Sequence, residues 1–568
     1  MIRRASPLAL ALLLPLGPLA ACGDDAAPAP QADSADAASP DVAADVAETD
    51  TSPPLSGPWA RLYPVSPAEG PADALVELAH LTADDGRLEG EFARVRNCVP
   101  DLEGGQKIPV QLGAATLTVT TCRPEATVFP DERGTYLGLA PPATPADDDG
   151  RFAELMMYHH MQVVHDYFKG VHGLTERDHP LDALVNVQAH IDLCDQWAKL
   201  PNAAFIPEES MSELPFGLDL GVDGDAIVFS GTDAKNFSFD ATVIYHEYTH
   251  AILGADRLSG VFADAQGLNN LPGALNEAYA DYFATTLIDS STLGAYSLND
   301  LGEFAICGIP LGSGGNQARD LDNAYRCPAD LTGEVHADSE LFSAVLWEMR
   351  AELGAEPADR VILAAVLELT QTSDFTEAAL ATIDQAGELL GAEVGGYVEE
   401  MFRSRGLVDC ERVLPVGLIG ARGLPVQLYS PEDFGAANPF GDFVPAAMQF
   451  SLDVPGGARS LTLTLTFSEG GLGSLLGGGG EVAADVAFKR GAGAILYRAG
   501  RGGPIHAADA VIAMDPETRQ VTLSGACLEA GPLVFSVHNK GGATALSKVE
   551  VSTSLTAAPT SNFDSCER

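Results

Sequence analysis

The chain has 568 residues, and its 80 acidic against 32 basic side chains give a formal charge of −48. This length is too great for one hydrophobic core and indicates roughly three or four domains. The acidity excludes nucleic acid and anionic membrane surfaces as partners, since both select basic patches.

Residues 1–22 have the pattern of an export signal. A basic start is followed by an apolar run that is too short to span a bilayer. The run ends in Leu-Ala-Ala-Cys at residues 19–22, which resembles the bacterial lipobox and implies cleavage before Cys22 and lipidation of its thiol. We expect an exported bacterial lipoprotein, held at the cell envelope or cell surface only by a lipid anchor on Cys22. The alternative is an ordinary secretory signal with a chance cysteine.

Residues 23–57 form a linker of Ala, Asp, Pro, Ser, Glu and Thr. Such a segment buries too little to offset its ordering entropy, so we expect a disordered tether. Eight further cysteines follow, an even number that favours disulfides in an exported chain. The sequence cannot fix their connectivity, although short intervening loops favour two pairs, Cys98 with Cys122 and Cys307 with Cys327.

The residue pattern then changes twice along the chain. Residues 58–150 alternate in short strand-like runs and predict a small N-terminal β domain. Residues 151–409 are largely helical, beginning with apolar residues at helical spacing. Residues 410–568 return to short strands with glycine-rich turns and predict a β-sandwich. The expected fold class is therefore α+β.

Within the helical part, a strand-like piece at 226–229 precedes several expected helices. The later helices are expected at 339–353, 358–370, 376–390 and 393–405. His159, His160 and His165 of the first helix have no carboxylate at metal-binding spacing, so we assign them to amphipathic packing. A β-rich part followed by a helical part predicts a cleft between two lobes.

The strongest chemical signal is His-Glu-Tyr-Thr-His at residues 246–250. Residues four apart share one helix face, so His246 and His250 can direct two imidazole nitrogens at one ion, with Glu247 beside them. With 12 histidines in the chain, a chance match to this pattern occurs in roughly one or two such chains per hundred. The competing interpretation is a solvated polar helix face.

A second segment supplies what the first one lacks. Glu277 and Asp281 are again four apart, so one helix can offer a carboxylate ligand and, one turn later, a carboxylate that orients an imidazole. Two neutral nitrogens, one carboxylate, an open fourth position and a nearby carboxylate base are what zinc-assisted hydrolysis needs. We therefore predict that His246, His250 and Glu277 bind Zn²⁺.

These motifs resemble the zinc site of the thermolysin-like and fungalysin-like endopeptidases, and the resemblance extends over residues 151–408. Residues 157–172 are similar to the family helix that precedes the sheet. The 26 residues between His250 and Glu277 exceed the thermolysin spacing and come closer to that of fungalysin. The resemblance implies a two-lobed metallopeptidase domain with a β-rich and a helical lobe.

The resemblance also implies roles for further side chains. Asn202 and Ala203 are similar to an edge strand that holds an extended peptide. Arg319 resembles an arginine that binds the substrate carbonyl, and His336 a histidine that stabilises the oxyanion. Two side chains are implied to orient the ligand imidazoles, Asn276 on His250 and Asp281 on His246.

The sequence departs from the family pattern at two places. The catalytic tyrosine of thermolysin, 11 residues after the second histidine, is replaced here by Val261. A calcium-binding carboxylate before the metal helix is replaced by Thr242, so calcium binding has no recognisable site. At the C-terminal end, residues 450–457 and 535–539 look like the prepeptidase C-terminal domains of secreted bacterial proteases.

The sequence therefore predicts a monomeric, exported zinc endopeptidase that acts on peptides or proteins. Glu247 is the expected general base, and His336 with Arg319 is expected to meet the developing negative charge. A catalytically degenerate adhesion lipoprotein is the alternative, but no ligand and no base is missing. An aminopeptidase would need an acidic motif near the edge strand, and none is evident. For His336, the competing role is to cap the helix expected to begin near Ser339.

Overall fold

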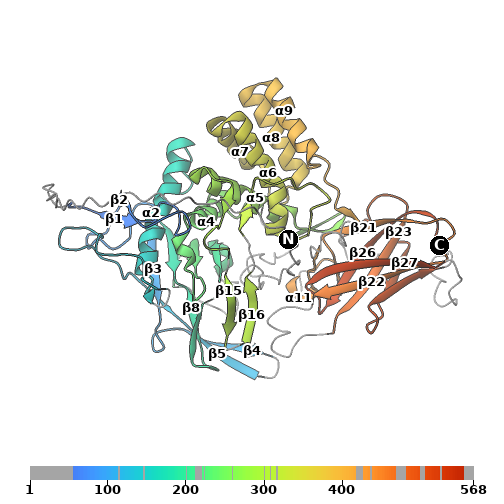
Figure 1. The fold of residues 1–568 in the computed structure, drawn as a ribbon, viewed down its shortest axis with the longest axis horizontal. Coiled ribbons are helices and arrows are strands. Elements are labelled where there is room, and N and C mark those ends of the chain that lie inside the picture. The colour runs from blue at the N-terminus through green and yellow to red at the C-terminus, as the bar shows by residue number, and fades with distance from the viewer. Residues whose placement is uncertain are drawn as a thin grey trace, which may run out of the picture.

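The computed structural model describes residues 55–554 apart from short gaps. The gaps are residues 113–114, 145–146, 200, 212–220, 223, 259, 300, 308, 315–317, 417–425, 435–437, 469–480, 499–505 and 525–527. Figure 1 shows three parts in chain order, which are a β-rich part with the first helices, a stack of helices, and a C-terminal part built of strands. The fold is therefore mixed α+β, as the sequence predicted.

The main sheet of the β-rich part has five strands in the order β10-β11-β7-β3-β6. These are β10 (Ala203–Ile206), β11 (Ala226–Phe229), β7 (Leu181–Val185), β3 (Ala93–Val99) and β6 (Arg123–Glu125). The three inner strands are parallel, and the two end strands are antiparallel to their neighbours. Every residue of β7 is buried, as expected for an inner parallel strand. β10 lies at one edge of this sheet.

The domain boundary drawn at residue 150 cuts through this sheet. β3 lies between β6 and β7, so residues on both sides of the boundary share one hydrogen-bonded layer. Helix α2 (Arg151–Asp166) packs on β3 with a row of fully buried side chains that includes Leu155 and Met156. Residues 93–125 therefore contribute strands to the same sheet that carries β10.

The remaining strands of the β-rich part form smaller sheets. One has the order β4-β5-β8-β9, and three are two-stranded pairs, β1 with β2, β14 with β17 and β15 with β16. Their bounds are β1 (Trp59–Leu62), β2 (Ala74–Glu77), β4 (Lys107–Leu112), β5 (Ala115–Thr121), β8 (Gln188–Ile191), β9 (Gln196–Lys199), β14 (Thr292–Leu293), β15 (Gly302–Ile306), β16 (Ile309–Gly314) and β17 (Arg319–Asp320). Short helical turns are η2 (Tyr167–Val171), α3 (Glu208–Met211) and η4 (Phe237–Phe239).

Six longer helices follow α2, and a hairpin separates the first two of them. They are α4 (Ala241–Leu253), α5 (Leu271–Ile288), α6 (Val335–Leu353), α7 (Ala355–Glu368), α8 (Phe375–Leu390) and α9 (Ala392–Ser404), and the hairpin is β12 (Phe262–Asp264) with β13 (Gly267–Asn269). α6 begins four residues before the predicted start, because Glu334 caps it by accepting a hydrogen bond from the backbone nitrogen of Ala337 at 2.8 Å. His336 therefore lies inside its first turn.

The histidines of α2 lie apart from the metal-binding helix face. His160 is buried, and its Nδ1 is 2.7 Å from the hydroxyl of Tyr245. His165 lies between Asp166 and Asp178, 3.2 and 3.1 Å away. These contacts agree with the packing role predicted from the sequence.

The C-terminal part consists of two sheets and the short helix α11 (Pro431–Phe434). One sheet has the order β18-β21-β26-β23-β24 with β20 beside β26, and the other has the order β19-β27-β22-β25. Their bounds are β18 (Val413–Pro415), β19 (Val426–Gln427), β20 (Val444–Pro445), β21 (Gln449–Val454), β22 (Ser460–Ser468), β23 (Ala483–Arg490), β24 (Ala510–Ala513), β25 (Gln520–Ser524), β26 (Gly531–Gly541) and β27 (Ala545–Ser554). Leu461 and Leu463 of β22 join Phe450 and Phe535 of the other sheet in one buried cluster, which is the packing of a β-sandwich.

Three disulfides connect the described cysteines. Cys98 pairs with Cys122, as we expected. The expected Cys307–Cys327 pair is wrong, because Cys307 pairs with Cys194 and Cys327 with Cys410. Both bridges close loops of more than 80 residues, so the folded proximity of distant segments decides them and the local spacing does not. Cys22, Cys527 and Cys566 lie outside the described residues.

Among the described residues, no helix combines the length and the apolarity that crossing a bilayer requires.

The shared sheet leads to a prediction about maturation. A chain that begins at residue 127 loses β3 and β6 and exposes the buried edge of β7, so we expect it to be insoluble or to lack a cooperative thermal transition. A chain that begins at residue 55 keeps every described strand and should melt at the temperature of the full chain. Circular dichroism melting curves measure both. A cooperatively melting 127–568 chain would show that residues 55–126 are dispensable for the fold.

Candidate metal centre

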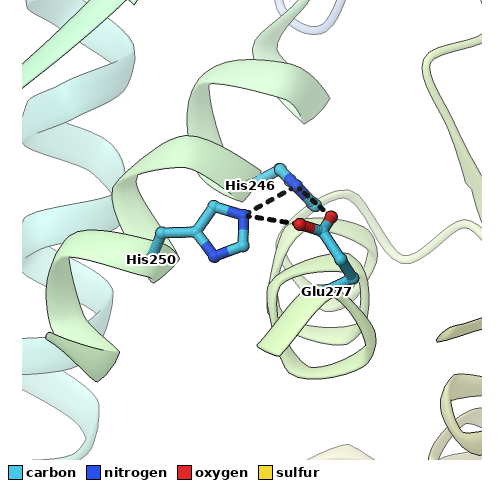
Figure 2. A group of neighbouring side chains, drawn as sticks. All are labelled: His246, His250 and Glu277. Atoms are coloured by element: carbon cyan, nitrogen blue, oxygen red, sulfur yellow. Dashed lines mark hydrogen bonds and ion pairs between the residues drawn. The ribbon is translucent and has the colours of Figure 1, made fainter. Parts of the chain in front are cut away.

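The two motif histidines lie on α4, a helix that is buried almost throughout. Asp240 caps the helix, accepting a hydrogen bond from the backbone nitrogen of Thr242 at 3.1 Å. Every residue of α4 except His250 is buried. The Nε2 atoms of His246 and His250, one turn apart, are separated by 3.0 Å. The helix therefore presents two imidazole nitrogens at one point, as Figure 2 shows.

α5 brings Glu277 to the same point. The chain leaves α4, forms the β12–β13 hairpin and returns as α5, which packs against α4. The Oε2 atom of Glu277 is 3.2 Å from Nε2 of His246, and its Oε1 atom is 3.7 Å from Nε2 of His250. The carboxylate thus faces both imidazoles (Figure 2).

The spacing of these three side chains fits a zinc ion. Ligand atoms of a tetrahedral zinc site, each about 2.0–2.1 Å from the metal, lie roughly 3.3 Å from one another. The separations of 3.0, 3.2 and 3.7 Å lie around this value, and one ligand atom from each residue falls within 4.8 Å of the others. Two imidazoles with one carboxylate are also the donor set of known catalytic zinc sites, which leave one position open.

Both ligand imidazoles contact side chains of α5 through their second ring nitrogen. The Nδ1–H of His250 donates to the side-chain carbonyl of Asn276. Nδ1 of His246 is 2.9 Å from Oδ1 of the fully buried Asp281. Because Nδ1 of each ring is occupied, Nε2 is left to face Glu277. Carboxylate and carbonyl partners orient metal-binding histidines in the same way in known metal sites.

The buried site favours positive charge at His246 but not at His250. Burial would lower the pKa of His246, but Asp281 and Glu277 raise it to about 10. Burial lowers the pKa of His250. Burial would raise the pKa of Glu277, yet the charges of His336, His250 and His246 hold that pKa well below its usual range. A metal ion bound at His246 would replace the proton that these carboxylates hold there.

Glu247, the expected base, is joined to the edge strand. Its Oε2 atom accepts a hydrogen bond from the backbone nitrogen of Phe205 on β10 at 2.7 Å. Glu247 follows His246 on α4, so this contact joins the helix that carries the ligand histidines to the edge strand. No pattern in the sequence indicates this contact, since the two residues are 42 positions apart.

Asn202 and Ala203 lie at the start of this edge strand. The carbonyl of Asn202 accepts a hydrogen bond from the backbone nitrogen of Ser230 at 3.0 Å, so it points into the sheet. Backbone groups alternate along a strand, so those of Ala203 point outward like the amide of Phe205. The outward side of β10 at Ala203 is thus the side on which Glu247 lies.

His336 lies next to the ligand cluster. Its Nε2 is 3.5 Å from Oε2 of Glu277 and its Nδ1 is 2.8 Å from Oε1 of Glu334. Burial would lower the pKa of His336, but these two carboxylates raise it to about 9. The capping role near Ser339 is wrong, because α6 begins at Val335 and Glu334 is its cap. Glu334 is a site residue that sequence reasoning missed, although it stands only two positions before His336.

Arg319 contacts the carboxylates that support the ligands. Its Nη2 is 2.6 Å from Oδ1 of Asp281 and 3.9 Å from Oε2 of Glu277. The guanidinium compensates the buried negative charge of Asp281. Burial would raise the pKa of Asp281, but Arg319 and His246 lower it. Val261, at the position of the thermolysin tyrosine, packs against the C-terminal cluster around Tyr429 and Phe443.

Residues 139–358 match the family of fungalysin metallopeptidases (M36). This part of the chain is therefore similar to a family of metallopeptidases. The match covers α4, α5, α6 and the edge strand, so every residue of the candidate centre falls inside it. The C-terminal sandwich lies beyond it.

Two individual proteins are also similar to part of this chain. Bacillolysin of Bacillus amyloliquefaciens is 27% identical over 199 residues, which are 32% of this chain and 35% of that protein. The structure of the precursor of protealysin, a metalloproteinase from Serratia proteamaculans, is 17% identical with a TM-score of 0.32, over 55% of this chain and 88% of that one. The chain thus spans about a third of the length of bacillolysin.

The support of His250 leads to a prediction. Asn276→Ala removes the acceptor that holds the His250 ring, so zinc affinity should fall by about 10- to 100-fold while the fold is kept. Competition against a chromophoric chelator measures the zinc dissociation constant. Gln385→Ala is the matched control, because it removes a side-chain amide of α8 that donates to Glu368 on α7. It should leave the zinc dissociation constant unchanged. An unchanged dissociation constant in Asn276→Ala would contradict the proposed support.

Proposed function

We propose that this protein is an exported zinc-dependent endopeptidase. The single observation that carries the proposal is the position of Glu247. This carboxylate follows the ligand His246 on α4 and accepts a hydrogen bond from Phe205 of the edge strand, so a base, a metal site and a strand that can pair with a peptide meet at one place. Hydrolysis of a bound peptide needs these three parts together.

The edge strand supports a peptide substrate. An extended chain laid beside β10 would pair with the outward backbone groups of Ala203, and its scissile bond would pass the ligand cluster beyond Phe205. Pairing through backbone atoms is independent of side chains, so it suits an endopeptidase that cleaves within long chains. We propose Asn202 and Ala203 as the start of this binding strand.

The chemical steps are assigned to the chain's own residues. Zinc, when held by His246, His250 and Glu277, would polarise the scissile carbonyl and acidify a water. Glu247 takes the proton of the attacking water and passes it to the departing amine. His336, protonated beside Glu277, donates to the developing oxyanion. We propose Arg319 as a second positive charge that meets the same oxyanion; in the described site its Nη2 donates to Asp281.

A catalytically degenerate adhesion protein is the second candidate. It would be favoured by a lost ligand or a lost base, and the described site keeps both. A β-sandwich like the prepeptidase C-terminal domains agrees with either role, because such a domain can be appended to an active or an inactive scaffold.

Glu247→Gln tests the proposal most simply. The ligands remain, so the variant should bind zinc like the wild type, and the loss of the base should lower peptide hydrolysis by at least ~10²-fold. Casein digestion and zinc content of the same preparation are the measurements. Glu356→Gln, on the first turn of α7, is the control and should keep full activity.

His336→Ala provides an independent arm of that test. It should retain zinc and KM but lower kcat, because an oxyanion donor acts only as charge develops. A zinc-loaded Glu247→Gln enzyme with wild-type turnover would remove Glu247 as the base and, with it, the peptidase assignment.

We also propose that the enzyme is a lipoprotein anchored through Cys22. The disulfides between described cysteines support an oxidising compartment outside the cytoplasm. The expectation is that the mature chain starts at an acylated Cys22 and partitions into detergent, and that Cys22→Ala abolishes the partitioning. Mass spectrometry of the mature N-terminus decides this, and an unmodified, freely soluble mature chain would rule the anchor out.

A further inference from the structure

The C-terminal sandwich contacts the hairpin that leads into α5. The side chain of Arg412 is 3% exposed and reaches both carboxylate oxygens of Asp264 on β12, at 2.7 and 2.6 Å. It also donates to the carbonyl of Leu268 on β13 at 2.7 Å. One nitrogen, Nη2, bonds the Asp264 carboxylate while Nη1 bonds the Leu268 carbonyl, so a single planar guanidinium sets the positions of both groups relative to each other. Arg412 thus holds both strands of the hairpin.

The turn of the same hairpin lies directly on the sandwich. The carbonyl of Ala265 accepts a hydrogen bond from the backbone nitrogen of Tyr497 at 2.8 Å, and that of Gln266 accepts one from the side chain of Gln449 at 3.0 Å. Gly267 has a φ of 113°, and a Cβ atom there would lie 3.2 Å from the ring of Tyr497. Only glycine allows so close an approach with this backbone conformation.

A second contact joins the sandwich to the segment that leads into α6. The carbonyl of Thr332 accepts a hydrogen bond from the backbone nitrogen of Gln427 at 2.8 Å. The hydroxyl of Tyr429 donates to the carbonyl of Gly333 at 3.4 Å. Three residues after Gly333, His336 faces Glu277. The sandwich therefore holds the backbone immediately before the proposed oxyanion donor.

The two contacted segments are connected to each other behind the metal centre. Asn270, the residue before α5, donates to Oδ2 of the fully buried Asp338 on α6 at 2.7 Å. Asp338 also accepts hydrogen bonds from the backbone nitrogens of Thr332 and Gly333, at 2.6 and 3.0 Å. Movement of either segment would thus disturb this buried carboxylate and the start of both helices. Buried networks of this kind lose much of their value when one member is displaced.

We propose that the C-terminal sandwich is a positioning element of the metal centre, in which Arg412 holds the hairpin before Glu277 and Tyr429 holds the segment before His336. The sandwich binds no ligand atom itself. It acts through α5 and α6, because a displacement of about 1 Å at a metal ligand or an oxyanion donor is enough to weaken binding or turnover.

The test compares two identical substitutions within the full chain. Arg412→Met removes the hydrogen bonds to the hairpin and keeps the length of the side chain. Arg490→Met is the matched control, because Arg490 pairs with Glu529 and Asp509 inside the sandwich. We expect Arg412→Met to speed amide hydrogen exchange in residues 262–269 and to raise the zinc dissociation constant by roughly 2- to 30-fold, the range of such couplings. Arg490→Met should change neither.

Tyr429→Phe separates the second contact from the first. It should speed exchange in residues 332–337 and lower kcat, with a smaller change in the zinc dissociation constant than Arg412→Met causes, because the contacted segment carries His336, which is not a ligand. If Arg412→Met fails to fold, Tyr429→Phe decides alone. The proposal would be overturned if both variants showed faster exchange but Arg412→Met bound zinc like the wild type and Tyr429→Phe kept the wild-type kcat. Unchanged exchange in both variants would also overturn it.

The kcat arm rests on the proposed peptidase function, whereas exchange and zinc binding do not. A protein that cleaves no peptide but shows the expected exchange and zinc shifts would refute the peptidase and leave the positioning role standing. A protein that cleaves peptides, but whose zinc affinity and hydrogen exchange are unchanged in Arg412→Met, would refute the positioning role and leave the peptidase standing.

Discussion

The packing of α4 against α5 concentrates charge in a largely buried place, and the arrangement of the site follows from how that charge is balanced. Glu277 and Asp281 are carboxylates on one buried helix face, and isolated buried carboxylates are costly. His246 lies between them, and Arg319 meets Asp281 from the other side. A divalent cation at the Nε2 atoms would complete this balance, which is why the same geometry that supports the fold also prepares a metal site.

The elements around this cluster each hold one side chain of the proposed mechanism in place. The edge strand β10 holds Glu247 through the amide of Phe205, so the base and the strand proposed to bind the peptide cannot move independently. Glu334 caps α6 and also pairs with His336, so the start of that helix and the direction of the imidazole are set together. The sandwich lies outside the family match. It contacts the connections before α5 and α6, and through them we propose that it supports the metal centre.

The sequence predicted the parts of the site that depend on local spacing. His246 and His250 share a helix face because they are four residues apart, and Glu277 and Asp281 share another for the same reason. The strands of the sandwich were likewise visible from alternation and glycine-rich turns. What could not be predicted depends on chain segments that meet only after folding. The parallel pairing of β3 with β7, the pairing of Cys194 with Cys307, and the contact of Arg412 with Asp264 are of this kind.

We propose that two imidazole nitrogens and one carboxylate oxygen of this chain bind zinc, with one position left to solvent. X-ray absorption at the zinc edge of the purified, zinc-loaded protein measures this ligand set directly. We expect two nitrogen ligands at about 2.0–2.1 Å with oxygen ligands at similar distance and no sulfur, and one nitrogen fewer in a His250→Ala protein. A sulfur shell near 2.3 Å, or an unchanged spectrum after that substitution, would contradict it.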